Sequence, residues 1–220
     1  MIYDNNNNNQ YYIATSNWND KEKSGPIKIF NFNGEKIKEI KDYINNENDR
    51  TFFLGTFFDI ESSKNYIISG NKGYCKSYDF NNNKLYHKYY DEGDERAHLS
   101  FIIYEKDSIL QLIESGKDGN IRIWDFHKGE LLNKIKINDN PLTSICMLNK
   151  YFILIGCFDN SMKLLDLTNK KIVKQIHNFN DKVLTIKKIT HPRYGLFIIS
   201  HDGENIINIY NYKNNINLII

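Results

Sequence analysis

The sequence of 220 residues has no apolar stretch long enough to cross a membrane, because Asn, Lys or Asp interrupts every run of Ile and Phe. A spanning helix needs about 18 or more consecutive apolar residues. The first ten residues also lack the positive charge and the apolar core of a secretory signal. We therefore expect no membrane partner and a cytoplasmic location, with the nucleus as the alternative.

The chain also lacks a strong excess of one charge, since 29 Lys and Arg face 27 Asp and Glu and leave a net charge of +2. Such a balance produces no extended field that would attract nucleic acid or a membrane surface. The composition therefore does not favour nucleic acid as a partner. The 15 Tyr and 13 Phe argue against disorder outside the Asn-rich tracts.

Recognisable catalytic and metal-binding patterns are missing as well. The three cysteines, Cys75, Cys146 and Cys157, form no C-x-x-C pair, and their odd number favours a reducing compartment over a disulfide framework. The six histidines are scattered, the acidic cluster at 91–95 lacks the spacing of a calcium loop, and no nucleophile elbow or phosphate-binding glycine loop occurs. The sequence predicts no catalytic residues, no metal site and no cofactor.

What the chain does contain is an internal repeat. A short apolar-polar-apolar-large pattern occurs five times, and its last residue recurs at intervals of 41 to 48 residues, at Phe30, Tyr78, Trp124, Leu165 and Tyr210. Each copy follows another apolar run across a turn, and another run comes about ten residues later. Four copies also have a run ahead of the set. The runs are short and rich in β-branched or aromatic residues, so the repeat predicts four strands, which we call a to d, and no helix.

The predicted organisation is therefore all-β, with an Asn-rich N-terminal tail at 1–10 followed by one repeat domain at 11–220. The five repeats cover roughly 11–40, 51–89, 98–135, 142–176 and 183–220. Because the tail is short and mostly Asn, we expect the first repeat to lack strand a.

The segment Ser115-Gly116-Lys117-Asp118-Gly119-Asn120-Ile121-Arg122-Ile123-Trp124-Asp125 closely resembles the WD-repeat β-propeller family. The other repeats keep only part of the pattern. The resemblance covers essentially 11–220 and implies a β-propeller of four-stranded antiparallel blades, of which about five are visible. It also implies a buried network in which Trp Nε1–H bonds a Ser hydroxyl, the hydroxyl bonds His, and His bonds the turn Asp. The residues carried over to this structural network are His98, Ser115, Asp118, Trp124, Asp159 and Asp202.

Five repeats are fewer than the seven blades common in that family, whose members close by sharing strands from both termini. Four explanations stay open: a fragment of a longer protein, an open arc, a five-bladed ring, or an oligomer. The last would involve self-association through exposed terminal blades.

The resemblance further implies a non-catalytic scaffold that binds other proteins or peptides on the face carrying the b–c turns and the d–a loops. In the family, the residue before the turn aspartate often contacts partners, and the first b–c connection here is long and carries a Trp. The candidate partner-binding residues are therefore Trp18, Asn71, Lys117, Phe158 and His201. The alternative is a propeller enzyme of the hydrolase or lyase type with a central site built from loops.

Overall fold

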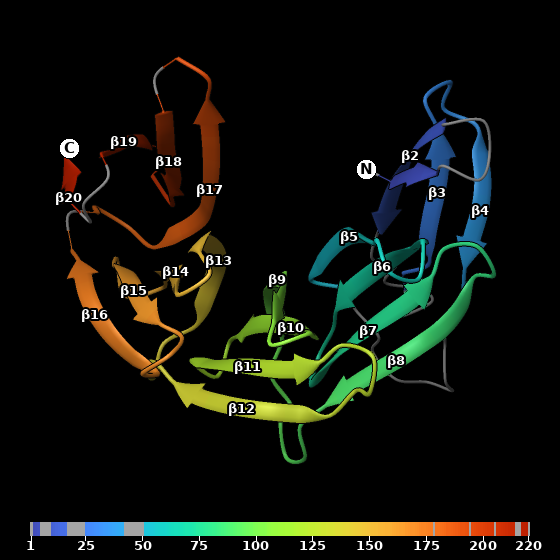
Figure 1. The fold of residues 1–220 in the computed structure, drawn as a ribbon, viewed down its shortest axis with the longest axis horizontal. Coiled ribbons are helices and arrows are strands. Elements are labelled where there is room, and N and C mark those ends of the chain that lie inside the picture. The colour runs from blue at the N-terminus through green and yellow to red at the C-terminus, as the bar shows by residue number, and fades with distance from the viewer. Residues whose placement is uncertain are drawn as a thin grey trace. The chain divides into compact units, whose positions relative to one another are not determined.

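The computed structural model describes residues 2–4, 10–16, 25–41, 51–177, 179–193, 195–204, 206–213 and 217–219. These residues form five antiparallel sheets of four strands each (Figure 1). The predicted all-β organisation in four-stranded antiparallel sheets is thereby confirmed. Among the described residues, no helix is long and apolar enough to cross a membrane.

The chain divides into two compact units, and the first comprises Met1–His98 and Asp125–Leu131. It holds the first two sheets, whose strands follow one another in sequence order. The strands are β1 (Ile2–Asp4), β2 (Gln10–Ser16), β3 (Ile27–Asn31) and β4 (Lys36–Ile40), then β5 (Phe53–Asp59), β6 (Lys64–Gly70), β7 (Tyr74–Asp79) and β8 (Lys84–Tyr90).

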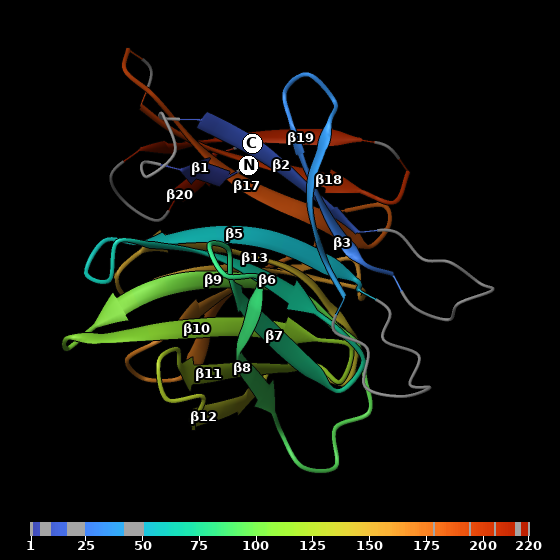
Figure 2. The same cartoon turned by 90° about the vertical axis from the view of Figure 1, so that its right-hand side faces the viewer.

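The second unit comprises Leu99–Trp124 and Leu132–Ile220, and it holds the fourth and fifth sheets and most of the third. In the fifth sheet β17, β18 and β19 lie side by side (Figure 2). The strands are β9 (His98–Lys106), β10 (Ile109–Gly116), β11 (Asn120–Asp125) and β12 (Leu131–Lys136); β13 (Leu142–Asn149), β14 (Phe152–Cys157), β15 (Met162–Asp166) and β16 (Lys171–Ile176); β17 (Val183–His191), β18 (Gly195–Asp202), β19 (Ile207–Lys213) and β20 (Asn217–Ile219).

The first sheet corrects one prediction, because it does have a first strand. Ile2 pairs with Tyr12 and Asp4 with Gln10, so β1 lies within the segment that we expected to be only an Asn-rich tail. Ile2 is 1% exposed and belongs to the core of the first unit. The strand has three residues and directly precedes an Asn run, so it carries too short an apolar pattern to be seen in the sequence.

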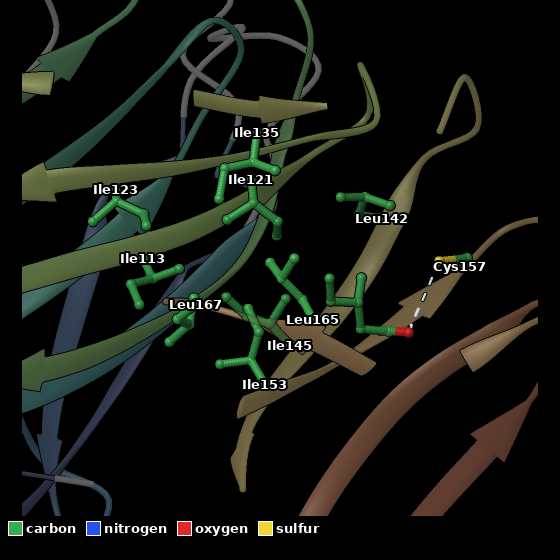
Figure 3. Packing of buried hydrophobic residues seen from close by; sticks show 11 residues of the cluster. Ile113, Ile121, Ile123, Ile135, Leu142, Ile145, Ile153, Cys157, Leu165 and Leu167 are labelled. Atoms are coloured by element: carbon green, nitrogen blue, oxygen red, sulfur yellow. Dashed lines mark hydrogen bonds between the residues drawn. The ribbon is translucent and has the colours of Figure 1, made fainter. Parts of the chain in front are cut away.

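The cores lie between neighbouring sheets. In the first unit, Ile67, Tyr78 and Phe80 of the second sheet pack with Tyr12 and Ile29 of the first. In the second unit, the third and fourth sheets share a cluster of isoleucines and leucines (Figure 3). Its labelled members are Ile113, Ile121, Ile123, Ile135, Leu142, Ile145, Ile153, Cys157, Leu165 and Leu167. Each of these sheets therefore gains stability by burying a face on its neighbour.

We expect Leu165→Ala to lower the free energy of unfolding by about 2–5 kcal/mol, because it leaves a cavity in this fully buried cluster. Urea unfolding followed by far-UV circular dichroism measures the change. Val173→Ala is the matched control, since Val173 is 52% exposed on β16, and it should stay within about 0.5 kcal/mol of the wild type. Equal losses in the two variants would contradict the assignment of this core.

Candidate protein-interaction face

The turn between β10 and β11 has a conformation that only glycine suits. Gly119 has φ +76°, and its N–H donates to the Gly116 carbonyl at 3.2 Å. A Cβ on Gly119 would overlap the carbonyl oxygen of Asn138, which belongs to the next connecting loop. The Asp-Gly pair therefore lets the turn and the loop approach each other closely.

Asp118 forms an ion pair with a buried arginine side chain next to this turn. Its Oδ2 accepts from Nη2 of Arg122 at 2.5 Å, and the Asn120 backbone N–H also donates to the carboxylate. The Arg122 side chain is fully buried in β11. Burial raises the pKa of Asp118, but the hydrogen bonds from Arg122 and Asn120 outweigh it, so the pKa lies below its usual value. The carboxylate therefore compensates a charge that the sheet could not bury alone.

The fourth sheet repeats this arrangement with a lysine. Lys163 Nζ lies 2.6 Å from Asp159 Oδ2, and Ser161 donates to Oδ1 of the same carboxylate. The Asn138 amide also donates to Oδ2, at 3.1 Å. Burial raises the pKa of Asp159, but the hydrogen bonds from Lys163 and Ser161 outweigh this effect, so the pKa lies below its usual value.

Backbone and side-chain hydrogen bonds join these turns to the connecting loops of the second unit. We call residues 117–120, 137–141, 158–161, 179–182 and 201–204 together the turn face. Its links include the N–H of Phe158 to the carbonyl of Pro141, the amide of Asn160 to the carbonyl of Asn180, and the N–H of Gly203 to the carbonyl of Lys182. Hydrogen bonds between the turns and the connecting loops therefore fix the backbone of the turn face.

The candidate contact residues differ in their exposure to solvent. Phe158 is 47% exposed, with Lys182 Nζ 5.0 Å from its ring centroid, and Lys117 is also exposed, while His201 is half-buried. These three residues belong to the turn face. Asn71 belongs to the first unit and is 2% exposed, and its Oδ1 accepts a hydrogen bond from the Ser69 hydroxyl. Its side chain is therefore unsuited to the partner contact that we expected. Trp18 lies outside the described residues.

The expected hydrogen-bond network differs in its partners. Trp124 Nε1 donates to Glu114 Oε1 at 3.1 Å, and both side chains are buried. The sequence pattern had assigned the acceptor to Ser115, whose buried hydroxyl has no hydrogen-bond partner in the part of the chain that the structure describes. Glu114 was missed, although a Glu inside an apolar strand b is itself a signal, because a buried carboxylate needs a donor.

Two further residues of that network have local partners. His98 Nε2 lies 3.1 Å from Oδ2 of Asp94, four residues earlier. Asp202 is 1% exposed, and its Oδ1 accepts from the backbone N–H groups of Glu204 and Ile206. Asp202 therefore stabilises its own turn by accepting backbone hydrogen bonds. Asp118 and Asp159, in contrast, each form an ion pair with an Arg or Lys side chain.

We expect Asp118→Asn to lower the free energy of unfolding at neutral pH by about 1–3 kcal/mol, because Arg122 then loses its anionic partner. A depressed pKa stabilises the fold above the unfolded-state value near 3.8, and this contribution disappears as the pH falls through the lower folded-state pKa. The deficit of the variant should therefore shrink below pH 3.8. Chemical denaturation at several pH values measures it.

Asp139→Asn is the control for this experiment. Its carboxylate lies 3.1 Å from Lys136 but is 98% exposed, so its removal should change stability by less than about 0.5 kcal/mol at every pH. A deficit of Asp118→Asn that did not depend on pH would contradict the proposed charge pairing.

No family model matches the sequence of the chain. It is 22% identical over 72 residues to the U3 small nucleolar RNA-associated protein 21 homolog of Schizosaccharomyces pombe, a match covering 33% of this chain and 8% of that protein. It is also 22% identical over 109 residues to Autophagy-related protein 16 of Arabidopsis thaliana, covering 49% of this chain and 21% of that protein. The matches thus span only a small part of either relative.

Solved structures resemble the chain over more of its length. The crystal structure of the computationally designed Ika4 protein has a TM-score of 0.55 at 14% identity, covering 78% of this chain and 96% of that one. The WD40 β-propeller domain of Doa1 has a TM-score of 0.68 at 15% identity, covering 92% of this chain and 61% of that one. The fold of this domain agrees with the Asp-Gly turn and the Trp-Asp ending of the motif at 115–125. The chain therefore has the fold of a WD40 β-propeller, which confirms the predicted β-propeller fold.

Proposed function

We propose that the chain is a non-catalytic scaffold that binds a peptide or a domain of another protein on the turn face. Similarity to a WD40 propeller suggests a protein-interaction scaffold in general. The observation that supports this particular face is Phe158, a half-exposed aromatic ring on a turn held by hydrogen bonds on both sides. A large ring presented on a rigid backbone loses little conformational entropy on binding, and such residues dominate many interfaces.

The charges of the turn face support binding over catalysis. The carboxylates of Asp118 and Asp159 are held by Arg122 and Lys163, so they already have partners in the fold. Lys117 is exposed beside the first of them, and Lys182 lies against the Phe158 ring. An exposed ring with neighbouring cations suits an extended peptide that carries an apolar and an acidic residue. The propeller enzyme remains the second candidate, and no arrangement in the turn face favours it.

A reducing compartment, and with it the cytoplasm or the nucleus, forms part of the proposal. The three cysteines are buried free thiols, and burial raises the pKa of Cys157 to about 11. A thiol of this kind is rarely ionised and reacts slowly. Cys146 and Cys157 therefore act as small apolar residues of the core.

We expect Phe158→Ala combined with His201→Ala to reduce the recovery of the bound proteins in a quantitative pull-down by about tenfold or more. Because both side chains lie on the surface or near it, the circular dichroism spectrum should not change. Unaltered recovery would show that the partner binds elsewhere.

Tyr151→Ala is a closely matched control. Tyr151 is 48% exposed and has Lys150 Nζ 4.9 Å from its ring centroid, much as Phe158 has Lys182. It lies before the start of β14, whereas Phe158 follows the end of the same strand, so it belongs to the opposite edge of the sheet. Its replacement should leave recovery unchanged.

A further inference from the structure

Lysines near the turn face pair with acidic residues. Lys163 Nζ lies 2.6 Å from Oδ2 of Asp159. Lys182 Nζ lies 3.9 Å from Oδ2 of Asp181, in the loop that leads into the fifth sheet. These positive charges therefore have anionic partners within the fold.

Toward the opposite ends of the same strands, the lysines have different contacts. Four of them are exposed, and within the part of the chain that the structure describes none of the four forms an ion pair. Lys188 Nζ donates to the carbonyl oxygen of Leu148 at 3.1 Å, and Lys170 Nζ donates to Oδ1 of Asn133. We call these four lysines together the lysine edge: Lys150, Lys170, Lys171 and Lys188.

Acidic residues are scarce around the lysine edge. Asp166 is the one acidic residue that the fourth sheet has at this end, and it pairs with Lys171 across β15 and β16. Its carboxylate already serves its own turn, because it accepts from the backbone N–H groups of Thr168 and Asn169 and from the Asn169 amide. In the fifth sheet, the segment 183–201 contains no acidic residue. Positive charge therefore predominates along this edge.

Hydrogen bonds fix the backbone that carries the lysine edge. The N–H of Leu167 donates to the carbonyl of Tyr151 at 2.8 Å, and so joins the turn after β15 to the turn before β14. The Tyr104 hydroxyl donates to the carbonyl of Lys150 at 2.8 Å, which links the fourth sheet to the third. The fourth sheet packs on the third and on the fifth within the second unit, so these contacts all lie inside that unit.

We propose that the lysine edge binds an acidic segment of another protein. The carboxylates of such a segment supply the anionic partners that these lysines do not have within the described chain. A lysine carries a compact charge on a flexible side chain, so it tolerates carboxylates at varying spacing. Lys150 precedes β14 and Phe158 follows it, so a partner on the lysine edge leaves the turn face open. The second unit then has two separate binding surfaces, which suits a scaffold that joins two proteins.

Two observations favour a protein over a single-stranded nucleic acid. Proteins bind such strands by stacking bases on aromatic rings along a cationic groove. Tyr151 is an exposed ring beside the lysine edge, but Lys150 Nζ lies 4.9 Å from its centroid, so one face of the ring is already covered. The whole chain also has a net charge of only +2, which gives little long-range attraction for a phosphate backbone.

Fluorescence anisotropy with a fluorescein-labelled oligoglutamate peptide tests the proposal. The 220-residue chain should bind the peptide, and added salt should weaken the binding. Lys150→Glu and Lys171→Glu should each lower the affinity by about tenfold or more, because each replaces an attraction by a repulsion. Lys136→Glu is the control, since Lys136 is 52% exposed at the other end of the strands and pairs with Asp139. Its affinity should stay within about twofold of the wild type, because a distant charge is screened.

Thermal melting shows whether each variant folds, and Lys170→Glu and Lys188→Glu replace any variant that does not. A wild type that does not bind the peptide, or an equal loss in Lys136→Glu, would overturn the proposal. Oligouridylate and phosphatidylserine vesicles serve as parallel probes, and tighter binding of either one, lost in the same variants, would exclude a protein as the ligand. The peptide has no apolar residue for Phe158, and no partner of the turn face is present, so the result is independent of the pull-down.

Discussion

The structure depends on burying both faces of a β-sheet against neighbouring sheets. In β14, Ile153 and Ile155 point into the cluster shared with the third sheet, while Leu154 between them packs in the cluster shared with the fifth. Such a strand is apolar at every position, in contrast to the alternating pattern of a sheet with one wet face. A single four-stranded sheet of this kind would expose both of its apolar faces to water, so its stability comes from its neighbours.

The turn aspartates compensate the buried positive charge of an Arg or Lys in the middle of strand c. Arg122 and Lys163 are buried among apolar residues, and the aspartate four residues earlier pairs with each of them. The same aspartate fixes the turn, and the residue before it lies at the surface. Adjacent residues therefore have different roles: Asp118 and Asp159 stabilise the fold, whereas Lys117 and Phe158 lie at the surface, where we propose that a partner binds.

The repeat pattern predicted nineteen of the twenty described strands, because each of these strands depends on a local apolar run and on turn residues such as Asp118-Gly119. It missed Ile2–Asp4, whose three residues become a strand only by pairing with β2. The family motif named Ser115 as the acceptor for Trp124, and the structure has Glu114 instead. Which of two consecutive side chains receives the indole N–H depends on the direction each one faces in β10, and a motif does not encode that.

Asn71 explains why position relative to the turn is not enough to identify a contact residue. In the second sheet Lys72 stands where the corresponding turns of the third, fourth and fifth sheets have an aspartate, and the buried Asn71 side chain accepts a hydrogen bond from Ser69. In those three turns the aspartate accepts hydrogen bonds from Arg122, from Lys163 or from backbone N–H groups. The residue before the aspartate is exposed at Lys117 and Phe158 and half-exposed at His201. Exposure at this position therefore depends on the partners that the residue itself finds within the fold, as Asn71 finds Ser69, and the spacing to the turn alone does not give it.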